Sequence, residues 1–262
     1  MDGIKDHPEV ERLLQTLLKE AQAILDERFV GMYLFGSLAS DDFDKDSDID
    51  VVVVTDGEIS EDGFLALRAM HQQIYAGDSP WTIQLEVSYI PRRAFRRYDP
   101  ADAVHPHIDR GSNELVMMEH DASWMVQRHV LRERGITLAG PAPQTLIDPV
   151  SRWDLREAMV AILDGWAAQI LRDPARLGRR GGQSYAVLSM CRILYTLQHG
   201  SVVSKRVAAR WAQDALSDRW TSLIERTWAG RENPERDARP EEVSETLAFI
   251  RYARERGRRS LS

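Results

Sequence analysis

The stretch LFGSLASDDFDKDSDIDVVVV, residues 34–54, combines a Gly-Ser pair, six aspartates and a run of four valines. The apolar run VGMYLF at 30–35 leads into the glycine, and the β-branched run IDVVVV covers 49–54. Short runs of this composition are typical of buried strands. The stretch therefore predicts two strands joined by a polar turn.

The aspartates at the start of the second strand have a spacing that brings two carboxylates together. Residues two apart in a strand share a face, so Asp48 and Asp50 point the same way. Such a pair needs a cation to offset its repulsion, or one carboxylate must take up a proton. Carboxylates at this spacing suit Mg2+, which also keeps waters and binds substrate phosphates. Glu86, on the polar face of a later strand candidate, supplies a third carboxylate, so we expect Asp48, Asp50 and Glu86 to form a metal site.

The Gly36-Ser37 pair follows one predicted strand and precedes a helical segment. Backbone N–H groups and a hydroxyl at such a position can hold a phosphate. We expect the other aspartates to form only a solvated turn: Asp41, Asp42, Asp44 and Asp46.

Other motifs with the same residue types do not fit. Alternate aspartates also begin the EF-hand calcium loop, but Ile49 and Thr55 stand where that loop requires Gly and Glu. The sequence has neither the phosphate-binding pattern G-x-x-x-x-G-K-[ST] nor the dinucleotide-binding pattern G-x-G-x-x-G. A phosphate site here is of another kind.

Hydrophobic periodicity divides the chain into two domains. The first half predicts helices at 8–25 and 63–76 and a strand at 82–90 with one polar face, which with the two strands above indicates an α/β or α+β domain with a small mixed sheet. The proline-containing segment 139–150 predicts a linker. The second half predicts only helices, the first beginning at Ser151 and Asp154 and running to Ile170 and the others at 183–199, 204–211, 218–229 and 240–256. We therefore expect domains at 1–150 and 151–262, the second an all-α bundle.

Composition limits the compartment and the partners. The chain has 262 residues, 43% of them hydrophobic and 29% charged, with a net charge of -7 and one cysteine. Without a signal-like start or a long apolar run, we expect a cytoplasmic protein that does not enter membranes. The negative charge argues against nucleic acid as the main partner, and Cys191 alone excludes an internal disulfide. We expect a monomer.

Three segments in order resemble one family. LFGSLASDDFDKDSDIDVVVV resembles the nucleotidyltransferase superfamily of the polymerase-β type. VLSMCRILYTLQHGSVVSKRVAARWA (187–212) and EHDASWMVQRHVLRERGITLAGPAP (119–143) look like the aminoglycoside adenylyltransferases that modify streptomycin and spectinomycin. The resemblance implies Mg2+-dependent transfer of AMP from ATP to a hydroxyl of such an antibiotic, with release of pyrophosphate.

The resemblance also implies roles for individual residues. Asp48, Asp50 and Glu86 would hold Mg2+, and Glu86 would be the general base. Six residues would bind the nucleotide: Gly36, Ser37, Ser47, Arg192, Lys205 and, near the adenine, Trp228. Ordinary structural explanations stay open for the last three, namely an ion pair between helices, a solvated lysine and a core tryptophan.

The acceptor site matches the family less well. Gly182 stands where streptomycin- and spectinomycin-modifying enzymes would place an aspartate, next to Arg179 and Arg180. The arginines could bind an anionic acceptor or form only a polar turn, while Asp121 could approach the cleft or cap a helix. We interpret His105-Pro106-His107 as a loop. Transfer to another small molecule or to a protein side chain, as in toxin-antitoxin systems, and an inactive nucleotide-binding module remain alternatives.

Overall fold

A six-stranded mixed sheet forms the centre of the first of two compact units, Met1–Val150 and Ser151–Ser262. The computed structural model describes residues 7–39 and 47–259. The spatial order is β5-β4-β3-β2-β1-β6, and only β2 and β3 are parallel neighbours. The strands are β1 (Phe29–Leu34), β2 (Ile49–Thr55), β3 (Leu85–Pro91), β4 (Val104–Ile108), β5 (Val116–Glu119) and β6 (Ile136–Ala139). This confirms the mixed-sheet fold class.

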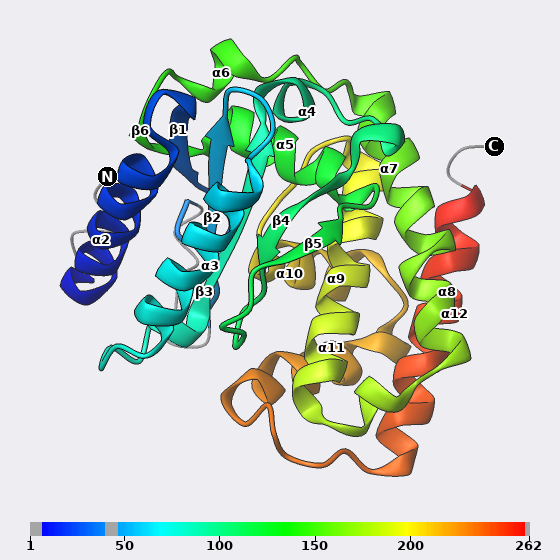
Figure 1. Cartoon of the computed structure of the whole chain (residues 1–262). Coiled ribbons are helices and arrows are strands. Elements are labelled where there is room, and N and C mark those ends of the chain that lie inside the picture. Colours follow the sequence, from blue (N-terminus) through cyan, green and yellow to red (C-terminus); the bar gives the residue numbers. More distant parts are fainter. Residues whose placement is uncertain (1–6, 40–46, 260–262) are drawn as a thin grey trace. The chain divides into compact units, whose positions relative to one another are not determined.

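The valine run of β2 is continuous because helices cover both faces of the sheet. Val51 and Val53 pack into a core with α2 (Pro8–Leu25) and α3 (Glu61–Tyr75), which lie over one face (Figure 1). Val52 and Val54 pack into a second core with α4 (Arg92–Arg96) and α5 (Ser123–Arg134). Strand β2 is therefore packed on both faces, and Asp50 lies at its beginning.

Two predictions about strands were wrong. Thr82–Gln84 form a 3-10 turn, so β3 begins only at Leu85, and its supposedly polar face is covered because Ser88 is 5% exposed. The His105-Pro106-His107 segment is not a loop but most of β4, with both histidines buried. The ladder between β3 and β4 pairs only Val87 with Ile108 and Ser88 with His107, so the missing N–H of Pro106 lies outside that ladder.

Segment 139–150 belongs to the first unit instead of forming a free linker. Its first residue ends β6, and α6 (Pro143–Leu146) follows. Ile147 is 2% exposed and packs in the second core, and the Tyr33 hydroxyl donates to the Pro141 carbonyl over 2.7 Å. Prolines in this segment shape a tight return of the chain, which composition alone does not distinguish from a linker.

The second unit is a helical bundle built around α9 (Arg180–His199), as predicted. Eleven residues of α9 are buried, and its neighbours are α7, α10, α11 and α12. The remaining helices are α7 (Arg152–Asp164), α8 (Trp166–Arg172), α10 (Lys205–Ala215), α11 (Thr221–Ala229) and α12 (Pro240–Arg259). Helix α9 ends at Gly200, whose φ of 64° is the left-handed conformation that suits a helix end.

The first helix of the bundle begins as predicted, but it ends earlier than predicted. Ser151 and Asp154 form a complete capping box. The single helix expected to continue to Ile170 instead breaks at Gly165, where α7 ends and α8 begins. Arg258 and Arg254 of α12 both pair with Asp164, which fixes the end of α7 to the last helix.

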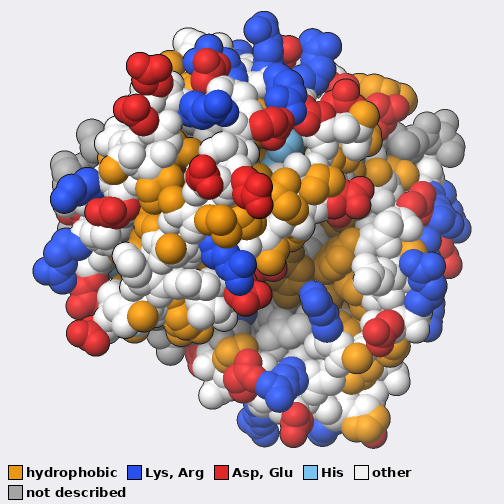
Figure 2. All heavy atoms as spheres, viewed as in Figure 1, with side chains coloured by type: hydrophobic (Ala, Val, Ile, Leu, Met, Phe, Trp, Pro, Cys, Tyr) orange, Lys and Arg blue, Asp and Glu red, His pale blue; other side chains and the backbone are white. Residues whose placement is uncertain are grey.

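Charge is spread over the surface. Figure 2 shows acidic and basic side chains intermixed on the face in view. No helix in residues 7–39 and 47–259 is long and apolar enough to cross a membrane.

Candidate active site

The turn after β1 is built around a close approach of Gly36 to Asp50. Gly36 has a φ of 69°, a conformation that L side chains rarely adopt. A Cβ at this position would lie 1.8 Å from Asp50 Oδ2. The backbone N–H of Phe35 also donates to the Asp50 carbonyl over 3.1 Å. The glycine therefore lets the turn pass directly beside the carboxylate.

Three carboxylates occur at one end of the two parallel strands. Asp50 and Glu86 are direct partners in the parallel register of β2 and β3, so they share a face of the sheet. Asp48 is two residues before Asp50, and the Ser37 hydroxyl lies 3.5 Å from the Asp48 carbonyl. Ser47, the residue before Asp48, is 6% exposed. The expected turn at Asp41, Asp42, Asp44 and Asp46 lies outside the described residues.

The electrostatics of this group centre on Glu86. Burial is the largest cause that raises the pKa of Glu86, which reaches about 8. The negative charges of Asp50, Asp48 and Asp109 raise this pKa further, and Arg110 opposes them. A carboxyl group with a pKa near neutrality is suited to general acid–base chemistry.

A basic side chain accompanies the acids. Arg110 Nη1 lies 2.6 Å from Asp48 Oδ1. The contact is an ion pair without hydrogen-bond alignment, since Asp48 Oδ1 is buried and has no hydrogen-bond partner in the described residues. Asp48 Oδ1 therefore pairs with a positive charge, and its capacity to accept hydrogen bonds is unused within the described residues.

The donor chemistry suits a hard divalent cation. As they stand, no three Asp, Glu, His or Cys side chains in the described part of the chain are arranged to hold a metal ion. Asp48, Asp50 and Glu86 are nevertheless oxygen donors that repel one another, with one buried oxygen unsatisfied. A set of this kind fits Mg2+, which takes a few carboxylates together with phosphate oxygens.

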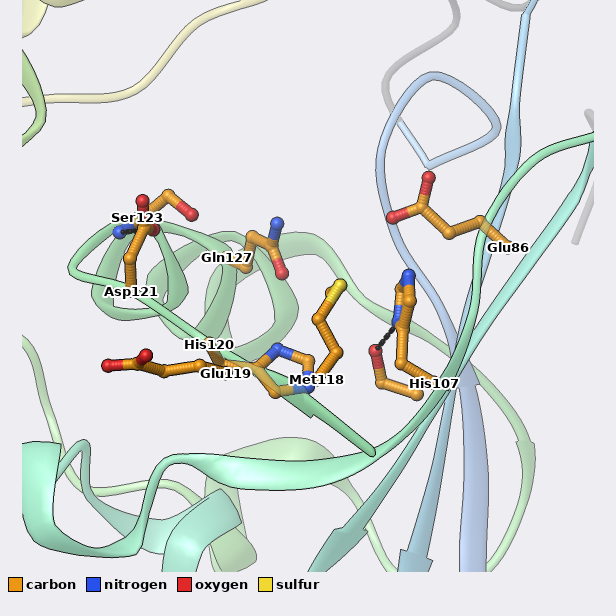
Figure 3. A pocket seen from close by; sticks show the side chains of 9 residues that line it. Glu86, His107, Met118, Glu119, His120, Asp121, Ser123 and Gln127 are labelled. Atoms are coloured by element: carbon orange, nitrogen blue, oxygen red, sulfur yellow. Dashed lines mark hydrogen bonds between the residues drawn. The ribbon is translucent and has the colours of Figure 1, made fainter. Parts of the chain in front are cut away.

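A pocket opens beside Glu86 within the first unit. It has a volume of about 200 Å³. Figure 3 shows Glu86 on one side and Gln127, Ser123 and Asp121 of the α5 region on the other, with His107, Met118 and His120 between them. The lining residues are Glu86, Ser88, His107, Met118, Glu119, His120, Asp121, Ser123 and Gln127.

The histidines of this pocket are uncharged components of its wall. His107 Nδ1 lies 2.9 Å from the Ser88 hydroxyl, and its Nε2 lies 3.1 Å from Asp109. Burial lowers the pKa of His107, and it lowers that of His120 to about 3. This histidine cluster was not predicted, because the segment was expected to be a loop and is a strand. An alternation of His105 and His107 in a strand would have been the signal.

Asp121 combines a capping position with a place in the pocket. One of its oxygens accepts the backbone N–H of Ser123 over 2.8 Å, at the start of α5. The side chain also lines the pocket. Both alternatives considered for Asp121 in the sequence are therefore compatible with its position.

The remaining predicted site residues lie in the second unit. Arg192 lies within α9, and Lys205 is the first residue of α10 after the cap Ser204. Lys205 Nζ is 5.2 Å from the centre of the Tyr185 ring. The guanidinium groups of Arg206 and Arg231 lie 5.5 and 4.9 Å from the Trp228 ring. Trp228 is half-buried, so it is not a core tryptophan.

Gly182 has a packing reason to be glycine. A Cβ there would lie 1.8 Å from the Arg176 carbonyl. Arg179 pairs with Glu235, and the backbone N–H of Arg180 donates to the Arg236 carbonyl. This turn is thus fixed by contacts within the bundle.

Comparison with known protein families accounts for both units. Residues 17–130 match the nucleotidyltransferase domain, and residues 145–256 match the C-terminal domain of aminoglycoside adenylyltransferase. The chain belongs to the aminoglycoside adenylyltransferase family. It is an enzyme of the nucleotidyltransferase class.

Individual members of the family match over most of their length. An aminoglycoside (3'') (9) adenylyltransferase of Escherichia coli is 25% identical over 256 residues, 93% of this chain and 94% of the relative. A spectinomycin 9-adenylyltransferase of Campylobacter jejuni is 24% identical, over 82% and 83% of the two chains. The fold matches that of a spectinomycin adenyltransferase from Enterococcus faecialis solved with ATP and spectinomycin, with a TM-score of 0.71, 14% identity and coverage of 95% and 99%.

Proposed function

We propose that this enzyme transfers AMP from ATP to a hydroxyl of an aminoglycoside-type antibiotic of the streptomycin or spectinomycin class, with Mg2+ and with release of pyrophosphate. The observation that carries the proposal is the pairing of Asp50 with Glu86 across two parallel strands, beside the Gly36 turn. It puts a carboxyl group with a raised pKa, a second carboxylate and a glycine turn at one end of the sheet.

Each proposed site residue of the first unit has a chemical task in this reaction. Glu86 accepts the proton of the acceptor hydroxyl, so that the oxygen can attack the α-phosphorus while the bond to pyrophosphate breaks. The hydroxyls of Ser37 and Ser47 and the backbone at Gly36 hold the phosphates. Asp48, Asp50 and Glu86 would hold Mg2+, which supplies charge neutralisation at the phosphates when bound.

We also propose that three residues of the second unit bind the nucleotide. Arg192 and Lys205 would contact the phosphates as cations, and Trp228 would lie near the adenine. The half-buried Trp228, with its two guanidinium neighbours, has the surface exposure that such a contact requires. Gly182 and Asp121 are the proposed acceptor contacts, Asp121 with the support of its place in the pocket.

The acceptor class is supported by the relatives, whose names identify aminoglycosides and spectinomycin as what they modify. The net charge of -7 also suits a cationic acceptor. We further propose that the enzyme is monomeric and acts in the cytoplasm, where its buried thiol Cys191 would stay reduced.

The direct test measures pyrophosphate release from Mg-ATP by the purified enzyme. The acceptors are streptomycin, spectinomycin and further hydroxylated antibiotics, and the variants are Asp50→Asn and Glu86→Gln. We expect turnover with at least one antibiotic and a loss of at least about 100-fold in kcat for each variant, because general acid–base catalysis alone contributes 10²–10⁴-fold.

Two outcomes separate the parts of the proposal. ATP binding without turnover on any antibiotic would remove the antibiotic acceptor and leave the nucleotidyltransferase class intact. Wild-type kcat in Glu86→Gln on an identified acceptor would show that another group accepts the proton. Repeating the assay with EDTA in place of Mg2+ tests the metal, since undiminished turnover would exclude it.

A further inference from the structure

The pocket beside Glu86 has two chemically different ends. Glu86 lies at one end, and Glu119 and Asp121 lie on the far side from it (Figure 3). Both rim acids are exposed. A ligand that fills the pocket would therefore meet the proposed general base at one end and two carboxylates at the other.

The wall between these ends carries hydrogen-bonding groups that the protein itself does not use. In the described residues the Gln127 carboxamide forms no hydrogen bond, although it can donate two and accept two. It lies one helical turn from Ser123, on the same side of α5 (Figure 3). A free carboxamide on a pocket wall is a group that can select a ligand by its polar atoms.

His120 provides a second, independent sign of a ligand. Its side chain lines the pocket and is only 7% exposed. Its Nε2 atom is buried and has no hydrogen-bond partner in the described parts of the chain. A buried polar atom without a partner costs free energy, and a polar ligand group or a water in the pocket would satisfy it.

The charge of the pocket comes from its carboxylates. Burial keeps His107 and His120 neutral at neutral pH, since it lowers the pKa of both. No Lys or Arg is among the lining residues. The lining therefore favours an ammonium group at the end formed by Glu119 and Asp121.

We propose that this pocket is an acceptor subsite within the first unit. One ring of the acceptor presents its reacting hydroxyl to Glu86, Gln127 hydrogen-bonds the ring, and Glu119 with Asp121 binds an ammonium substituent. The inference rests on the proposed function and adds to it that part of the acceptor selection lies in the nucleotidyltransferase unit, at Gln127 and Glu119.

The test is steady-state kinetics of Gln127→Leu and Glu119→Gln on an acceptor that the wild-type enzyme turns over. Each substitution keeps the side-chain size and removes one polar function. We expect the acceptor KM to rise by roughly 3- to 10-fold in each variant, the range of one lost hydrogen bond or one exposed ion pair, while the KM for ATP stays unchanged. The rise in Glu119→Gln should shrink in 0.5 M salt and that in Gln127→Leu should not, because salt screens only charges.

Matched controls come from exposed residues of the same unit that do not line the pocket. Gln73→Leu on α3 and Glu133→Gln on α5 should leave both KM values unchanged. Far-ultraviolet circular dichroism and thermal melts confirm that each variant is folded.

The outcomes distinguish this inference from the function on which it rests. Turnover by the wild type with an unaltered acceptor KM in both pocket variants would overturn the subsite and leave the proposed function standing. A parallel rise in the KM for ATP would also overturn it, because the pocket would then serve the nucleotide. No turnover by the wild type on any acceptor would overturn both.

Discussion

The carboxylate of Asp50 occupies the space in which a Gly36 side chain would begin. Asp50 Oδ2 lies 1.8 Å from the position of a Gly36 Cβ, and the glycine has a φ of 69°. The phosphate-binding turn proposed at Gly36 and the carboxylate on β2 are therefore in direct contact, and a side chain at position 36 would displace Asp50.

Gly36→Ala should abolish adenylyl transfer. The added methyl group would push the Asp50 carboxylate away and strain the turn, so we expect a fall of at least about 100-fold in kcat/KM, comparable to losing a general acid–base partner. Gly57→Ala is the matched control, since Gly57 also has a positive φ of 90° but open space around a Cβ. It should cost about 1 kcal/mol of stability and retain activity. Equal activities of the two variants would contradict the role given to the Gly36–Asp50 contact.

Stability should depend on the ionisation of Glu86. Its pKa rises from an ordinary 4.5 to about 8 in the folded protein, so the folded state binds the proton more tightly. The contribution of the protonated Glu86 carboxyl group to the free energy of unfolding is complete below about pH 4.5 and is lost as the pH rises through 8. Glu86→Gln should therefore raise the melting temperature of the metal-free protein by about 3 °C or more at pH 8.5. At pH 5 it should have little effect, and a gain confined to acid pH would refute the assignment.

Acid should destabilise the first unit through His71. Its Nε2 lies 2.7 Å from the Tyr89 hydroxyl, and burial lowers its pKa from 6.5 to about 4. The folded state thus binds the proton less tightly, and stability is complete above pH 6.5 and falls between pH 6.5 and 4. Urea unfolding across this range should show a smaller pH dependence in His71→Gln. An unchanged pH dependence in His71→Gln would contradict the role given to His71.

Lys205 and Arg192 of the second unit should affect the KM for ATP and leave the KM for the acceptor unchanged. Lys205→Met and Arg192→Met each remove one charge proposed to contact phosphate, and we expect a rise of about 10-fold in the KM for ATP, as for the loss of a charged hydrogen bond. The acceptor KM should stay constant. Arg251→Met, at an exposed position on α12, is the control. An ATP KM that moves equally in all three variants would indicate general electrostatics instead of direct contact.

Local sequence rules predicted much of this fold because they act over a few residues. The capping box of Ser151 and Asp154 and the helix end at Gly200 form as the residue types require. The valine run of β2 also predicts its structure, since continuous β-branched runs are typical of strands that are buried on both faces. The segment His105-Pro106-His107 was expected to be a loop, and it lies in strand β4. Pro106 is paired with Met117 of β5, and His107 is paired with Ser88 of β3, so the partners that define this strand lie elsewhere in the chain.

By itself the sequence determined which residues are the candidates for the chemistry: the spacing of Asp48 and Asp50 and the Gly36-Ser37 turn are local patterns on one strand and its approach. Only the tertiary structure decided what surrounds Glu86. The parallel register brings it beside Asp50, burial raises its pKa, and residues of β4, β5 and α5, among them Gln127, line the pocket with it. Those contacts join residues far apart in the chain, and their geometry follows from the packing of the whole unit and has no short-range signature in the sequence.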